Sequence, residues 1–190
     1  MSNRPLLLLV FIHDDLEDYD KSTLYDDHFS WLIDEMESIS GRPMAVILIS
    51  PEDSKGMSNF TYKNQNHGQS LAQWHDRVNE HLDTYPINNF DIKLHKVLLL
   101  TRDPINSSVL GVAYYKGYGA IASIAHNRTP AHEVGHLFGA NHEDGEVLYD
   151  GWWHETTMRP FDEYSNLRGD ANRFSDANRE SIREYLSEYY

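Results

Sequence analysis

The fold of this chain is decided by the stretch Thr129-Pro-Ala-His-Glu-Val-Gly-His-Leu-Phe-Gly-Ala-Asn-His142. Its first two histidines, His132 and His136, are four residues apart, so on a helix they lie on one face, one turn above the other. This spacing lets two imidazoles reach one metal ion. Thr129 suits the N-cap and Pro130 suits the first helical position. The sequence therefore predicts a helix that begins just before the first metal ligand.

A third histidine follows this predicted helix. Gly139 can adopt a left-handed conformation and end the helix sharply, after which His142 can approach the same ion from another direction. Three neutral imidazoles leave a fourth position open for water, which is typical of a catalytic rather than a structural zinc site. Glu133 lies about 100° around the helix from His132, so it can face the water without binding the metal and act as the general base.

The extended form of this motif is much more specific than the short form. A His-Glu-x-x-His pattern arises by chance in about 4% of chains of this length and composition. The added glycine and third histidine reduce this chance to roughly 1 in 10,000. The alternative interpretation is a helix with two surface histidines and an unrelated third.

Away from the motif, strand and helix patterns alternate early and helices dominate late, which predicts one α/β (α+β) domain over residues 1–190. Apolar runs predict strands at Leu6–Ile12, Met44–Ile49, Val97–Leu100 and Ala120–Ala125. Helical spacing predicts helices at about Leu24–Ile39, Gln69–Leu82 and Pro130–Phe138, and a last helix capped by Ser175. The polar residues 51–68 are expected to form a long surface loop.

Composition excludes several kinds of site and partner. The 190 residues carry a formal charge of −14, which disfavours nucleic acid and anionic membrane surfaces as partners. The absence of cysteine excludes disulfides, thiolate zinc sites and thiol nucleophiles. Leu6–Ile12 lacks the following small-residue cleavage site of a signal peptide, and no apolar run is long enough for a membrane span. We expect a cytoplasmic protein or one exported by a non-classical route.

The motif resembles the zinc signature of the metzincin metallopeptidases, and within them the adamalysin (reprolysin) group. Met158, sixteen residues after His142, fits the Met-turn that lies beneath the metal in that family. Val97–Thr101 followed by Gly111–Tyr115 resembles the third strand and the glycine-led loop of the adamalysins. Glu143 stands where adamalysins usually carry aspartate. The resemblance implies a metzincin-like zincin fold with a twisted, mixed five-stranded sheet.

The resemblance also implies where a protein or peptide substrate binds. An upper lobe of about residues 1–140 and a lower lobe of about residues 141–190, irregular and ending in a helix, would hold an extended substrate in the cleft between them. Ala122, Ser123 and Ile124 are expected on an exposed edge strand that pairs with the substrate. Arg159, Pro160 and Phe161 are expected to form the wall of the pocket for the residue just after the cut.

The sequence favours a zinc-dependent metalloendopeptidase with one Zn²⁺, acting as a monomer and controlled by a separate inhibitor protein. Two alternatives stay open, a catalytically silent zinc-binding module of the same fold and a zinc amidohydrolase that acts on a non-protein amide. His95 occupies the place of an acidic calcium ligand of some relatives, so a calcium site gains little support. His126 and His154 are further candidates for substrate contact near the cleft.

Overall fold

The computed structural model describes residues 4–163, 165 and 167–187, and its main feature is a five-stranded sheet with the strand order β2-β1-β3-β5-β4. Strands β2, β1, β3 and β5 are parallel, and β4 pairs antiparallel with β5. The strands are β1 (Leu6–Ile12), β2 (Met44–Ile49), β3 (His95–Thr101), β4 (Gly111–Ala113) and β5 (Gly119–Ser123). The predicted α/β class with a mixed five-stranded sheet is confirmed.

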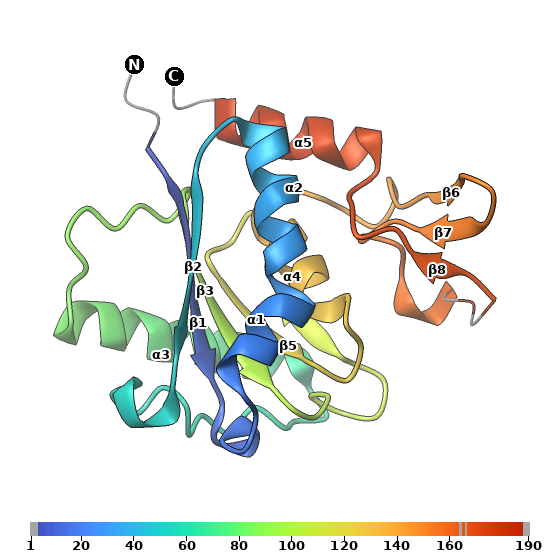
Figure 1. The fold of residues 1–190 in the computed structure, drawn as a ribbon. Helices are drawn as coiled ribbons and strands as arrows, with labels where there is room; N and C mark the ends of the chain where they lie inside the picture. Colours follow the sequence, from blue (N-terminus) through green and yellow to red (C-terminus); the bar gives the residue numbers. More distant parts are fainter. Residues whose placement is uncertain (1–3, 164, 166, 188–190) are drawn as a thin grey trace.

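Helices cover both faces of this sheet (Figure 1). The helix α3 (His67–Thr84) lies on one face, where Trp74 and Val78 pack against Leu9, Leu99 and Ile121. The opposite face carries α1 (Lys21–His28), α2 (Ser30–Ser40), α4 (Thr129–Leu137) and α5 (Asp176–Ser187). Successive residues of a strand point to opposite faces, and β1 and the Val97–Leu100 part of β3 are apolar on both. This explains why their sequences are continuous apolar runs rather than alternating ones.

Three helix and loop predictions need correction. The predicted helix at 24–39 is two helices, because Phe29 has a non-helical φ of −124° and its buried ring packs into the core. The predicted surface loop at 51–68 buries Met57, Phe60 and Tyr62 beneath α3. The N-cap of α4 is Arg128 rather than Thr129, since the backbone N–H of Thr129 already donates to the carbonyl of His126 (3.0 Å).

The predicted edge strand is also wrong. β5 lies inside the sheet between β3 and β4, and both of its neighbours are hydrogen-bonded to it. The edge next to the metal-binding motif is instead β4, a strand of three residues that has one neighbour in the sheet. Its short length and single glycine gave no periodic signal in the sequence.

The chain after Ala140 forms a separate small sheet and then the last helix. The strands β6 (Val147–Tyr149), β7 (Trp153–Glu155) and β8 (Gly169–Asp170) make up a three-stranded sheet that the sequence did not predict. The predicted cap of α5 is confirmed, because Ser175 Oγ accepts a hydrogen bond from the backbone N–H of Asn178 (3.2 Å). Within the described residues, none of the helices combines the length and apolar character needed to cross a bilayer.

Candidate metal and catalytic centre

Helix α4 holds the first two histidines of the motif in a fixed position. It packs across β4 and β5, and all but one of its nine residues are buried. Pro130 lies in its first turn and Gly139, with a φ of +94°, follows its last turn. The left-handed conformation of Gly139 reverses the chain, which then brings His142 back toward the helix.

The three imidazoles of the motif converge on one point. His142 Nε2 lies 2.8 Å from His132 Nε2 and 3.0 Å from His136 Nε2. Exposure increases from the buried His132 through the half-buried His136 to the exposed His142, so an ion can reach the group from solvent. Within the described part of the chain this is the one group of three or more histidine, aspartate or glutamate residues close enough to hold a metal.

The outer nitrogens of two of these rings are tied to backbone carbonyls. His132 Nδ1 lies 2.8 Å from the carbonyl oxygen of Thr157, and His136 Nδ1 lies 3.0 Å from that of Ala140. A carbonyl can only accept a hydrogen bond, so each Nδ1 carries the proton and each Nε2 has a free lone pair. Histidine ligands of metals show this same outer contact, which fixes the tautomer and the ring orientation.

The charge state of the rings also suits a metal. Burial, followed by the neighbouring His136, lowers the pKa of His132 well below its ordinary value. Burial and the neighbouring His142 lower the pKa of His136 to about 4. Both imidazoles are therefore neutral near pH 7, as metal ligation requires. Zinc–nitrogen bonds of about 2.0–2.1 Å in a tetrahedron place nitrogens about 3.3 Å apart, so the rings need to separate by only a few tenths of an ångström to fit zinc.

Glu133 lies beside the three rings rather than among them. Its side chain is 5% exposed and packs against Gly111 of β4, where a Cβ would come within 2.8 Å of its Oε1. Gly111 thus leaves the space that the carboxyl group occupies. Burial raises the pKa of Glu133 to about 8, and a divalent cation nearby would lower it again by favouring the carboxylate.

These side chains line a cavity of about 600 Å³. The lining includes the segment from Ser108 to Ala113, which contains the edge strand β4, and also Pro160 and Phe161. The sequence predicted Pro160 and Phe161 here, but it missed His67 and the 108–113 segment. Arg159 does not line the cavity, because its guanidinium pairs with Glu163 (2.6 Å).

The three residues expected to pair with substrate do not line this cavity. Ala122 and Ser123 are fully buried in β5, and both pair with β3 on one side. On the other side Ala122 pairs with Gly111 of β4, and the backbone N–H of Ser123 donates to the carbonyl of Leu110, the residue before β4. Ile124 follows the strand, and its backbone N–H donates to the carbonyl of Thr101 (2.8 Å). The parallel pairing with β3 and the antiparallel pairing with β4 leave β5 no free edge for a peptide.

Met158 is fully buried below α4. A Cβ on Gly135, the residue before His136, would lie 2.6 Å from Met158 Sδ and 2.7 Å from Phe174 Cε1. Met158 therefore packs directly against the helix that carries the histidines, and the residue before it supplies the carbonyl to His132. Its role as a Met-turn stays a prediction.

The other histidines proposed for the cleft differ in position. The ring of His126 packs against Phe161 at 5.2 Å between ring centres, so it lies behind the cavity wall. His154 is on β7, where its Nδ1 lies 3.0 Å from a carboxylate oxygen of Asp150, and it does not line the cavity.

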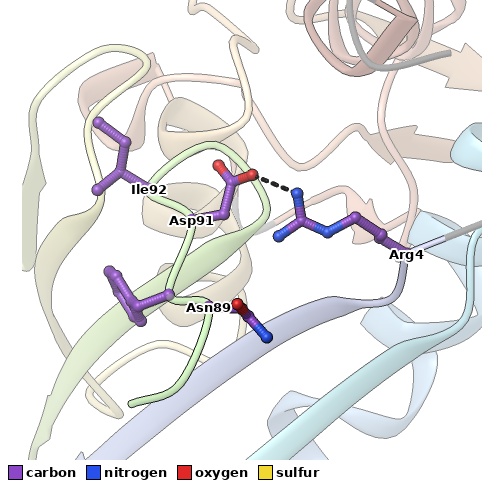
Figure 2. A pocket seen from close by; sticks show the side chains of 5 residues that line it. Arg4, Asn89, Asp91 and Ile92 are labelled. Atoms are coloured by element: carbon purple, nitrogen blue, oxygen red, sulfur yellow. Dashed lines mark hydrogen bonds and ion pairs between the residues drawn. The ribbon is translucent and has the colours of Figure 1, made fainter. Parts of the chain in front are cut away.

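A second hollow of about 570 Å³ lies by the start of β1 and β3, away from the histidines. Figure 2 shows its lining side chains, among them Arg4 and Asp91, which form an ion pair of 2.8 Å across it. None of the motif residues lines this hollow, so the catalytic candidates belong to the first cavity alone.

Comparison with protein-family models and with curated proteins finds no match. Among solved structures the chain is similar to archaemetzincin (AmzA) from Archaeoglobus fulgidus, determined in complex with malonate. The sequence identity is 14%, the TM-score is 0.45, and the match covers 93% of this chain and 99% of that chain. Similarity at this level assigns neither a family nor an activity, and the function must be inferred from the geometry of the site.

Proposed function

We propose that this chain is a zinc-dependent metalloendopeptidase. The observation that supports this function is the convergence of three imidazoles beside the carboxyl group of Glu133 in a cavity of about 600 Å³, with His142 Nε2 2.8 Å from that of His132 and 3.0 Å from that of His136. His132, His136 and His142 would hold the ion. Zinc bound there would polarise the substrate carbonyl and lower the pKa of water toward about 7.

The chain's own groups supply the remaining chemistry. Glu133 is placed to accept a proton from the attacking water and to pass that proton to the amide nitrogen of the leaving group. The Thr157 and Ala140 carbonyls hold two imidazoles in the orientation that keeps their Nε2 atoms turned inward.

The substrate is an extended peptide in this proposal. The free edge of β4 lies in the cavity wall, so a peptide can add to the sheet there by backbone hydrogen bonds, in the place that the sequence assigned to β5. Phe161 and Pro160 border the space for the side chain just after the cut. An adamalysin-like subgroup, a monomeric state and control by a separate inhibitor protein belong to the same proposal and rest on the sequence.

Digestion of a broad peptide library, with and without a chelator, tests this function. We expect cleavage that the chelator abolishes and that added zinc restores. Glu133→Ala should retain one zinc per chain while cleavage falls by about 100-fold or more, the usual contribution of a general base. Glu143→Ala, which removes an exposed carboxylate one residue after the third histidine, is the matched control and should cleave normally.

Two other outcomes would replace the proposal. A protein that binds zinc but cleaves no peptide in the library would be a silent binding module. Cleavage restricted to acyl-amide or peptidoglycan amides would identify an amidohydrolase. The buried Glu133 beside the three rings favours a catalyst over the silent module, because a module that only binds zinc does not need a base there.

A further inference from the structure

A buried arginine joins the active-site helix to the chain below it. Arg128 immediately precedes α4, and its carbonyl accepts the backbone N–H of His132 (2.9 Å). Its side chain is only 1% exposed. Removing a guanidinium from water costs free energy unless carboxylates and carbonyls contact it inside the protein. The contacts of Arg128 therefore show what holds this charge in place.

The acids beside Arg128 come from the small sheet. Glu155 of β7 is fully buried, with Oε2 3.5 Å from Arg128 Nη1, and Asp170 of β8 places Oδ1 3.2 Å from the same nitrogen. Glu155 Oε1 also lies 3.2 Å from Nη1 of Arg168, whose side chain is 35% exposed. Arg128 therefore crosses from α4 to β7 and β8, whereas Arg168 neutralises Glu155 from the solvent side.

The same guanidinium contacts the segment that completes the site. Arg128 Nη1 lies 3.4 Å from the carbonyl of Thr156, the residue before the Thr157 carbonyl that accepts from His132. The ring of Phe161 lies 5.3 Å from the guanidinium carbon and 5.1 Å from the ring of His132. One side chain thus supports both the carbonyl that orients a zinc ligand and the aromatic wall of the cavity.

We propose that Arg128 is a positioning residue for zinc binding and for the pocket that receives the substrate residue just after the cut. This inference rests on the proposed function. Arg128 acts through Thr157 on the ring orientation of His132 and through Phe161 on the shape of the pocket. A merely structural ion pair would change the stability of the protein and leave the metal affinity and the substrate preference of the folded molecules as they are.

Arg128→Met tests this role. Zinc affinity, measured by competition with a chromogenic chelator, should fall about tenfold, at the lower end of the usual effect of groups that support metal ligands. The visible spectrum of the cobalt-substituted protein should shift, because His132 turns. For peptides with a large side chain just after the cut, the variant should have a raised KM and a smaller change in kcat. For peptides with a small side chain at that position, the rise in KM should be smaller.

Arg168→Met is the matched control. It removes a guanidinium from the same Glu155 but leaves α4, Thr156 and Phe161 in place, so its zinc affinity and cobalt spectrum should match those of the wild-type protein. If Arg128→Met does not fold, Arg128→Lys decides the question. Lysine keeps the positive charge but has no planar guanidinium to lie against the Phe161 ring, so we expect zinc affinity between the wild-type and Met values.

A folded Arg128→Met or Arg128→Lys protein with wild-type zinc affinity, wild-type cobalt spectrum and wild-type KM values would overturn the positioning role. The proposed function fails differently. If the wild-type protein binds no zinc, both the proposed function and the positioning role of Arg128 are wrong. If the wild-type protein binds zinc but cleaves no peptide, only the proposed function fails, and the zinc affinity and the cobalt spectrum still test the role of Arg128.

Discussion

The sheet region, residues 4–140, and the C-terminal region, the described residues of 141–187, are held together by different interactions. The sheet region has an apolar cluster on each face of its parallel strands, and one of them also includes Met158, Phe174, Ile182, Tyr185 and Leu186 of the C-terminal region. The C-terminal region has strands of only two or three residues and exposes Tyr149, Trp152, Trp153 and Leu167. Its buried contacts with the sheet region include this apolar packing of Met158 and α5 and the ion pair of Glu155 with Arg128.

This difference matters because the candidate metal centre draws on both regions. The sheet region supplies His132, Glu133 and His136 on one rigid helix, and the C-terminal region supplies His142 and the Thr157 carbonyl. A metal held by both regions stabilises the folded arrangement, since binding to the native state alone adds to its stability. We therefore expect metal binding to stabilise the C-terminal region more than the sheet region.

The largest effect should come from removing the ligand that the C-terminal region supplies. His142→Ala should weaken zinc binding by more than about 100-fold, since even loss of a group that only supports a ligand costs 10- to 100-fold. Chelator competition measures this affinity. His154→Ala, a control in the same region outside the cavity, should bind zinc as the wild-type protein does. Equal zinc affinity in the two variants would remove His142 from the ligand set.

The next effect tests the sheet region alone. Trp74 is fully buried on the face of the sheet opposite α4. Trp74→Ala should lower the free energy of unfolding by about 3–5 kcal/mol, because a large cavity opens in a packed core. Denaturant unfolding measures the loss. Zinc affinity of the folded variant should not change, and a large change there would mean that the two regions are more tightly coupled than their contacts indicate.

A third variant tests the packing between the regions. Gly135→Ala places a methyl group 2.6 Å from Met158 Sδ and 2.7 Å from Phe174 Cε1, so these two buried side chains must shift. We expect a loss of about 1–3 kcal/mol in the free energy of unfolding and weaker zinc binding. Gly68→Ala is the control, because its Cβ meets only Asn66 at 3.4 Å and alanine favours a helix over glycine. Thermal unfolding should separate the two, and a neutral Gly135→Ala would mean that Met158 does not support the helix.

The smallest effect concerns a polar contact of the sheet region. Burial opposes ionisation of Asp15, but hydrogen bonds from His13, Tyr62 and the backbone N–H of Arg102 together lower its pKa from 3.8 to about 2. The folded pKa lies below the ordinary value, so this stabilisation is complete above about pH 4 and is lost as the pH falls through 2. Asp15→Asn should cost about 1 kcal/mol at pH 7. The difference in Tm between the two proteins should shrink from pH 5 to pH 2, and a constant difference would contradict the lowered pKa.

The sequence predicted the elements whose signal is local. Leu6–Ile12 and Met44–Ile49 are strands with the predicted bounds, because short continuous apolar runs are typical of strands in parallel sheets. Leu6–Ile12 is covered on both faces, whereas Met44–Ile49 is an edge strand that leaves Ile47 exposed. The spacing of His132, His136 and His142 predicted their convergence because helix geometry and one left-handed glycine fix it.

The elements that could not be predicted from the sequence depend on contacts between residues far apart along the chain. Three residues of β4 become the edge strand only because they pair with β5, and β8 has two residues that pair with β7. The Thr157 carbonyl and Arg128 belong to no sequence motif, because their contacts join residues 25 or more positions apart in the chain. Phe60 and Tyr62 are aromatic residues in an otherwise polar stretch of sequence, which was a signal that 51–68 is not a simple surface loop, and both are buried in the structure.

The most direct test of the central claim is the zinc X-ray absorption spectrum of the wild-type protein loaded with one equivalent of zinc. The convergence of His132, His136 and His142 predicts three imidazole nitrogens at about 2.0–2.1 Å and one additional light-atom ligand. A spectrum with fewer than three imidazoles, or one that matches zinc in water, would contradict the proposed metal centre.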